Sequence, residues 1–161
     1  MSPDPAFDGE AIDRGDIDLD VGTLAKAISW VEDGGKLPDT FLDAGKAKSQ
    51  TIGITGSPGV GKSTTVDALI KLLRERNFSV AVLAVDPSSP ISGGALLGDR
   101  IRLTDHFTDS KVFIRSLATR GHLGGLSAST KSVLNLTQSA QFDFIIVETV
   151  GVGQSEVEVM R

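Results

Sequence analysis

Residues 56–63 restrict the fold of this chain more than any other segment. They read Gly-Ser-Pro-Gly-Val-Gly-Lys-Ser, which matches the pattern Gly-x-x-x-x-Gly-Lys-Ser/Thr. The glycines let backbone N–H groups surround a phosphate at close range. Residues 51–55 have the composition of a short buried strand, and residues 64–76 have that of a helix. The sequence therefore predicts a P-loop at a helix N-terminus, where the helix dipole favours anions.

The P-loop pattern assigns a role to each of its polar side chains. Lys62 is expected to reach the β- and γ-phosphates of a nucleoside triphosphate, and the Ser63 hydroxyl is expected to bind Mg²⁺. The residues predicted to bind nucleotide here are Gly56, Ser57, Pro58, Gly59, Val60, Gly61, Lys62, Ser63 and Thr64.

Apolar segments alternate with helical patterns along the rest of the chain. Such alternation predicts right-handed βαβ crossovers, and therefore an α/β fold with a parallel sheet between two layers of helices. The expected strands are 51–55, 78–85, 111–115 and 142–147, and the expected helices between them are 64–76, 94–107 and 123–140.

The N-terminal part of the chain differs in composition from this α/β pattern. Residues 1–20 are strongly acidic and are expected to form a disordered tail. Residues 21–49 are expected to hold one short helix, about 21–32, and a connector, with Trp30 near the apolar stripe of that helix and thus in a packing role. The nucleotide-binding domain is predicted to occupy residues 50–161.

Composition excludes several classes of function. The net charge of −5 gives no basic surface, so nucleic acid is not an expected partner. The chain has no cysteine, and two histidines, His106 and His122, cannot form a His-rich metal site. No apolar run reaches the roughly 20 residues of a membrane span, and the N-terminus lacks the pattern of a signal peptide. A cytoplasmic location is expected.

An acidic residue follows the last predicted strand. Residues 144–147 are apolar and Glu148 comes directly after them. Ligands of open parallel sheets bind beyond the carboxyl ends of the strands, so Glu148 is expected near the P-loop, where it could hold Mg²⁺ through water or orient an attacking water. Gly151 follows three residues later and could let a backbone N–H approach the γ-phosphate.

Two further carboxylates are candidates for the metal site. Asp86 ends the second strand, where it could face the Mg²⁺ shell or serve as a turn residue before Pro87. Asp99 follows a glycine-rich stretch that suits a switch loop, but a helix cap explains it equally well. Arg115 and Arg120 could act as an arginine finger or form structural ion pairs.

The order of these motifs resembles the MeaB/ArgK family of P-loop GTPases, which are associated with methylmalonyl-CoA mutase and belong to the SIMIBI class. The resemblance covers roughly residues 20–160. It rests on the segments Gly53–Thr64, Ala84–Ser89, Gly98–Arg100, Thr119–Gly125 and Glu148–Glu156.

The resemblance implies a GTPase that acts as chaperone for an adenosylcobalamin-dependent acyl-CoA mutase, with GTP or GDP as ligand and Mg²⁺ as cofactor. It implies catalytic roles for Lys62 and Glu148, and a metal site of Ser63, Asp86, Asp99 and Glu148. It also implies a homodimer for the full-length protein.

The chain departs from the family pattern in its length. The guanine-reading motif Asn-Lys-x-Asp is absent, because the two asparagines, Asn77 and Asn135, are followed by Phe78 and Leu136. We therefore expect the chain to be the N-terminal half of a longer protein, and preference for GTP over ATP follows from the resemblance alone. Two alternatives stay open: a P-loop ATPase or small-molecule kinase of the lysine/arginine/ornithine transport type, and a nucleotide-binding fragment without turnover.

The position of Gln154 predicts the rate of hydrolysis. Many small GTPases orient the attacking water with a glutamine directly after the glycine that corresponds to Gly151. Here Gln154 does not directly follow Gly151, so slow intrinsic hydrolysis is expected.

Overall fold

A computed structural model describes residues 20–37, 49–86, 101–118 and 128–149 of the chain. Four parallel strands form one sheet in the order β1-β4-β2-β3, which is a doubly wound arrangement and not a simple sequential one. The strands are β1 (Gln50–Ile54), β2 (Val80–Asp86), β3 (Val112–Ala118) and β4 (Phe144–Thr149).

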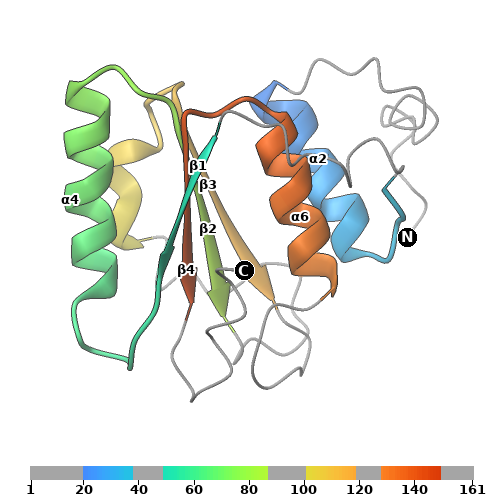
Figure 1. Cartoon of the computed structure of the whole chain (residues 1–161), viewed down its shortest axis with the longest axis horizontal. Helices are drawn as coiled ribbons and strands as arrows, with labels where there is room; N and C mark the ends of the chain where they lie inside the picture. Colours follow the sequence, from blue (N-terminus) through green and yellow to red (C-terminus); the bar gives the residue numbers. More distant parts are fainter. Residues whose placement is uncertain (1–19, 38–48, 87–100, 119–127, 150–161) are drawn as a thin grey trace.

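Helices cover both faces of the sheet, which gives the three layers that the sequence predicted (Figure 1). One face carries α4 (Lys62–Glu75) and the 3₁₀ helix η2 (Ile101–His106). The other face carries α2 (Val21–Glu32) and α6 (Ala128–Ser139). Each face has its own hydrophobic core, one built around α2 and α6 and one around α4.

The strands divide their side chains between these two cores by simple alternation. In β4, Ile145 and Val147 belong to the core under α2 and α6, whereas Phe144 and Ile146 belong to the core under α4. The next residue on the α4 side is Glu148. The alternation therefore carries this carboxylate to the face of the sheet on which the P-loop helix lies.

Helix α2 is bound to the sheet by both apolar and polar contacts. Leu24, Ile28 and Val31 form the predicted stripe and are buried. Arg115 on β3 donates to Glu32 at 2.6 Å and to Ser29 at 2.9 Å, so this arginine forms a structural ion pair. Trp30 packs against the same core, as expected.

Some element boundaries differ from those expected. Strand β3 continues three residues past Arg115, because the ion pair with Glu32 lets a charged side chain lie between sheet and helix. The described part of the expected helix 94–107 is the 3₁₀ helix η2, while the rest of it and residues 123–127 lie outside the described residues. None of the described helices is long and apolar enough to cross a membrane.

Polar contacts fix the register at the amino end of the sheet. Asp143 accepts hydrogen bonds from the backbone N–H of Ser79 at 2.7 Å and from its hydroxyl at 2.8 Å. These two donors lower the pKa of Asp143. The Phe144 N–H donates to the Ser79 carbonyl at 3.1 Å, and the rings of Phe78 and Phe144 meet edge to face at 5.1 Å. The starts of β2 and β4 are thereby held in one alignment.

Candidate nucleotide-binding site

The P-loop connects the carboxyl end of β1 with the first turn of α4, as its sequence predicts (Figure 1). Gly59 and Gly61 have φ angles of 82° and 92°, in the left-handed region that side chains with a Cβ rarely adopt. Gly61 is the N-cap of α4, so the positive φ turns the chain directly into the helix. These glycines give the loop its path.

The N-termini of α4 and α2 are capped differently. The Asp20 carboxylate accepts a hydrogen bond from the Thr23 N–H at 2.7 Å and caps α2. No side chain makes the corresponding bond at Gly61 of α4 within the described part of the chain. The first N–H groups of an uncapped helix need an external acceptor, and a phosphate oxygen is a suitable one.

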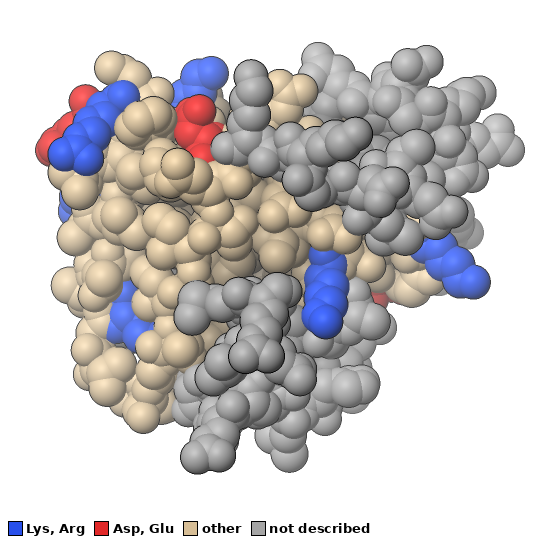
Figure 2. Space-filling view, in the orientation of Figure 1, with Lys and Arg blue, Asp and Glu red and all other residues tan. Residues whose placement is uncertain are grey.

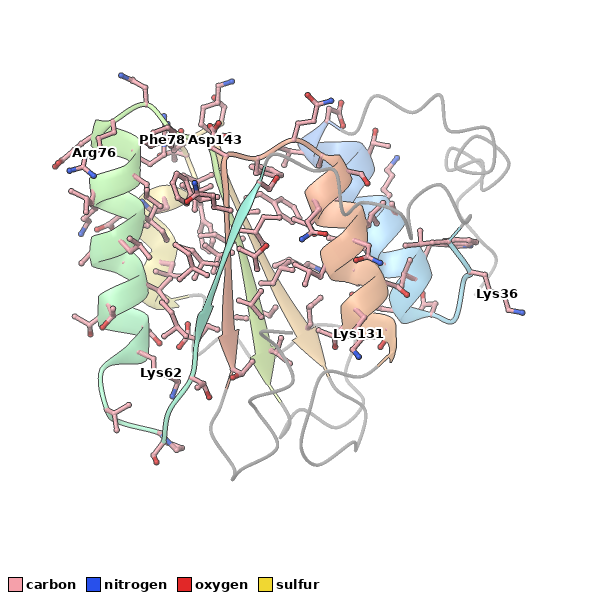
Figure 3. The ribbon with its side chains drawn as sticks, in the orientation of Figure 1. Lys36, Lys62, Arg76, Phe78, Lys131 and Asp143 are labelled. Carbon is pink, nitrogen blue, oxygen red and sulfur yellow. The ribbon has the colours of Figure 1, made fainter. Side chains whose placement is uncertain are left out.

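The Lys62 side chain folds back over the loop rather than extending into solvent (Figure 3). Its ammonium group donates to the carbonyl oxygens of Gly56 at 2.7 Å and Ser57 at 3.0 Å. The positive charge of Lys62 is therefore held beside the N–H groups of the loop.

The Ser63 hydroxyl and the Glu148 carboxylate meet at the base of the loop. Ser63 Oγ donates to Glu148 Oε1 at 3.1 Å, although the two residues are 85 positions apart in the chain. Both residues are buried, with 8% and 9% of their surface exposed. The sheet produces this contact because Glu148 lies opposite Ile54, two residues before the P-loop begins. The sequence predicted both residues at one site, and the structure brings them together.

The donor set of this pair suits a hard divalent cation. A hydroxyl and a carboxylate offer oxygen only, which is what Mg²⁺ prefers, and Mg²⁺ commonly keeps several waters beside one or two protein ligands. No cluster of three or more His, Cys, Asp or Glu side chains occurs among the described residues. The pair by itself would supply two oxygen ligands, and further oxygen ligands such as water or phosphate would fill the other positions around Mg²⁺.

The remaining predicted site residues are placed only in part. The backbone of Asp86 ends β2, two residues beyond Ala84, which pairs with Glu148. Thr64 lies in the first turn of α4 and is exposed. Asp99, Gly151, Arg120 and His122 lie outside the described residues.

One polar contact next to the site had no signal in the sequence. His106 at the end of η2 is buried, and its Nε2 lies 2.9 Å from Asp67 Oδ1 on α4. Asp67 also accepts a hydrogen bond from Lys71, and these two partners lower the pKa of Asp67, Lys71 having the larger effect. The contact attaches η2 to the P-loop helix. Because the two partners are 39 positions apart in the chain, no local sequence pattern indicates it.

Residues 24–161 match the family model described as "Methylmalonyl Co-A mutase-associated GTPase MeaB". This chain belongs to the MeaB family. The family that the motifs resembled is thus confirmed.

Several MeaB-like relatives are similar over most of this chain. GTPase ArgK of Escherichia coli is 44% identical over 146 residues, which are 86% of this chain and 44% of ArgK. A Pyrococcus horikoshii protein that is named as a GTPase is 57% identical over 110 residues, 68% of this chain and 35% of that protein. The mouse mitochondrial methylmalonic aciduria type A homolog is 44% identical over 115 residues, 71% of this chain and 28% of the mouse protein.

A solved structure confirms the fold. The crystal structure of a LAO/AO transport system kinase superposes with a TM-score of 0.61 at 31% identity, covering 93% of this chain and 44% of that one. The chain thus spans less than half the length of these relatives.

Proposed function

We propose that this MeaB-family chain binds GTP and, in the protein to which its sequence belongs, hydrolyses it to GDP and phosphate. The observation that carries the proposal is the contact between Ser63 and Glu148 at the base of the loop that Lys62 covers. The contact places the Ser63 and Glu148 oxygens beside the phosphate-binding loop and the Lys62 ammonium group. All of these groups lie at the carboxyl end of the sheet, where ligands of open α/β sheets bind.

In this proposal, each part of the site stabilises a different part of the reacting phosphate. The backbone N–H groups of residues 56–63 and the N-terminus of α4 bind the non-bridging oxygens. Lys62 neutralises charge that develops on the β- and γ-phosphates. Glu148 holds a water molecule, either in the metal shell or in line with the γ-phosphorus.

The metal that the family implies is Mg²⁺, and Ser63 and Glu148 are the described residues that would hold it. When bound, it would neutralise phosphate charge. Three further residues complete the proposed site because their sequence segments resemble those of the MeaB/ArgK family: Asp86, Asp99 and Gly151.

Titration with a fluorescent GTP analogue, with and without Mg²⁺, tests the binding step. We expect Mg²⁺ to tighten binding of wild-type chain, and Ser63→Ala to remove most of that effect while binding without Mg²⁺ is retained. Thr65→Ala is a matched control, because Thr65 is a hydroxyl residue of the same helix turn, and its hydroxyl donates to the Gly61 carbonyl at 3.1 Å. Equal Mg²⁺ dependence in wild type and Ser63→Ala would contradict the proposed metal ligand.

Release of phosphate tests turnover and separates the candidate activities. Phosphate released from GTP into water supports hydrolysis, and transfer to a small-molecule acceptor would indicate a kinase. Parallel assays with ATP test the preference for guanine, which we propose from family membership.

We further propose that the intact protein serves as chaperone for an adenosylcobalamin-dependent acyl-CoA mutase. The support is the family description, which names the association with methylmalonyl-CoA mutase. The test adds such a mutase to the intact protein. It measures the rate of GTP turnover and whether the two proteins co-purify in a pull-down experiment. We expect faster turnover and a stable complex; unchanged turnover without co-purification would contradict the chaperone role.

A further inference from the structure

The 3₁₀ helix η2 and the turn that follows it are attached to α4 at two points. His106 Nε2 lies 2.9 Å from Asp67 Oδ1, and Arg74 Nε donates to Asp109 Oδ2 at 2.7 Å. The Asp109 N–H donates to the His106 carbonyl at 3.1 Å, so the two points are also joined to each other. Leu103 of η2 is buried in the core under α4. Both apolar and polar contacts therefore hold η2 on the P-loop helix.

The hydrogen bond between His106 and Asp67 has one possible direction. An ionised carboxylate only accepts hydrogen bonds, so the histidine ring carries a hydrogen on Nε2 and donates it. His106 is buried, whereas the Asp67 side chain is 25% exposed and also accepts a hydrogen bond from Lys71. Loss of Asp67 would leave a buried donor without this acceptor, which costs free energy. The pair therefore fixes η2 at one position along α4.

The two attachment points show in which direction the segment runs. His106 contacts Asp67 in the second turn of α4, and Asp109 contacts Arg74 about two turns later. Residues before His106 therefore extend toward the P-loop end of α4, and Figure 1 shows η2 alongside that helix. A 3₁₀ helix of this length advances about 10 Å, which exceeds the roughly 7.5 Å from Asp67 to the start of α4. Helix η2 is thus long enough to reach the level of the P-loop.

This attachment bears on the proposed nucleotide site through the chain on either side of it. Asp67 belongs to the same helix as Ser63 and follows it by one turn. Asp99, a candidate for the metal site, comes two positions before η2 in the sequence. Consecutive Cα atoms are only about 3.8 Å apart, so a bond that fixes η2 on α4 also limits the distance between the Asp99 backbone and the helix that carries Ser63.

We propose that His106 is a positioning residue for the magnesium site: by holding η2 on α4, it sets the distance between Asp99 and Ser63 when metal and nucleotide bind. The inference rests on the proposed function, because it gives His106 a part in the same Mg²⁺-dependent binding. The contact of His106 with Asp67 includes neither the P-loop nor Lys62. Binding of the phosphates without Mg²⁺ should therefore not depend on it.

The second attachment point offers a matched control. The side chains of Arg74 and Asp109 are 21% and 32% exposed, and Arg74 lies near the C-terminal end of α4. Figure 2 shows charged side chains of both signs over that end of the helix, away from the P-loop. Solvent screens such exposed pairs. Loss of the Asp109 contact should therefore leave the position of η2 at Asp67, and with it the metal site, unchanged.

Titration of the chain with a fluorescent GTP analogue at a series of Mg²⁺ concentrations tests the proposal. We expect His106→Ala and Asp67→Ala each to raise the Mg²⁺ concentration for half-maximal binding about tenfold, as loss of residues that orient metal ligands does, with unchanged affinity in the absence of Mg²⁺. The double variant should match each single one, because either substitution removes the same contact. His106→Gln keeps an N–H donor and should recover most of the wild-type Mg²⁺ dependence, and Asp109→Ala should retain all of it.

The outcomes separate this inference from the proposed function. Circular dichroism shows which variants are folded, and Asp67→Ala keeps the test decisive if the buried His106→Ala fails to fold. Wild-type Mg²⁺ dependence in folded Asp67→Ala would overturn the inference, and so would an equal loss in Asp109→Ala, which would indicate a general effect of stability. Wild-type chain whose nucleotide binding does not respond to Mg²⁺ would instead contradict the proposed metal site of Ser63 and Glu148, and the role of His106 with it.

Discussion

Strand β4 has an acidic residue at each end, and the two residues differ in burial and in the groups that they contact. Asp143 at the amino end is exposed and accepts two hydrogen bonds from Ser79, which joins β4 to β2. Glu148 at the carboxyl end is buried and meets Ser63 on the P-loop helix. One carboxylate aligns strands, and the other lies where it can serve a ligand.

The lysines of α4 show the same contrast. Lys62 is in the first turn, and its ammonium group rests on the carbonyls of Gly56 and Ser57. Lys71 is two and a half turns later and pairs with Asp67 on the exposed side of the helix. Burial of an ionised group costs free energy, so a chain that places charged groups at the carboxyl end of the sheet indicates a function there. The comparison predicts that substitutions at the two ends affect different measurements.

The largest effect is expected from Lys62→Ala. It removes the charge beside the phosphates and should raise the Kd of a GTP analogue at least about 100-fold, or about 2.7 kcal/mol. Isothermal titration calorimetry measures the change. Retention of wild-type affinity would show that Lys62 does not bind phosphate.

Glu148→Gln should have the next largest effect. Glutamine can still accept the Ser63 hydrogen bond, so the fold should persist, but the charge that attracts Mg²⁺ is lost. We expect the Mg²⁺ concentration needed for half-maximal nucleotide binding to rise about 10- to 100-fold. The matched control is Asp143→Asn at the opposite end of the strand, which should leave the Mg²⁺ dependence unchanged.

Asp143→Asn should instead lower the stability of the fold, by about 1 kcal/mol or less at pH 7, since solvent screens its charged hydrogen bonds. Because Ser79 holds the pKa of Asp143 below its usual 3.8, the charge stabilises the native state above about pH 4. That contribution disappears as the pH falls through the lowered pKa. Urea denaturation at pH 7 and pH 3 should therefore show a larger difference between wild type and variant at pH 7 than at pH 3.

The smallest effect is expected from Lys71→Ala. Its bond to Asp67 at 2.8 Å is an exposed pair four residues apart on one helix. We expect unchanged nucleotide affinity and a melting temperature closer to wild type than that of Asp143→Asn. A loss of affinity as large as that of Lys62→Ala would remove the distinction between the two lysines.

Local sequence patterns predicted the parts of the fold that depend on neighbours in the chain. The P-loop, the helix that follows it and the apolar stripe of α2 are set by residues within one or two turns, and all three were confirmed. The strand-end rule also predicted that Glu148 would lie near Ser63.

Features that depend on strand order could not be predicted in this way. Nothing in the sequence of β1 shows that β4 would pair with it while β2 and β3 lie further away. The contacts of Arg115 with Glu32 and of His106 with Asp67 join residues 83 and 39 positions apart, and only the packed layers bring them together. The 3₁₀ geometry of η2 was missed for a similar reason, because its periodicity over six residues is too short to separate it from an α-helix.

The hydrogen bonds from Lys62 to the carbonyl oxygens of its own loop affect the kinetics of nucleotide binding. Since internal bonds fix the path of residues 56–63, the conformational entropy of the loop is lost when the chain folds and not when a nucleotide arrives. A preorganised cradle of this kind favours fast association, so differences in affinity among nucleotides should arise mainly in their dissociation rates.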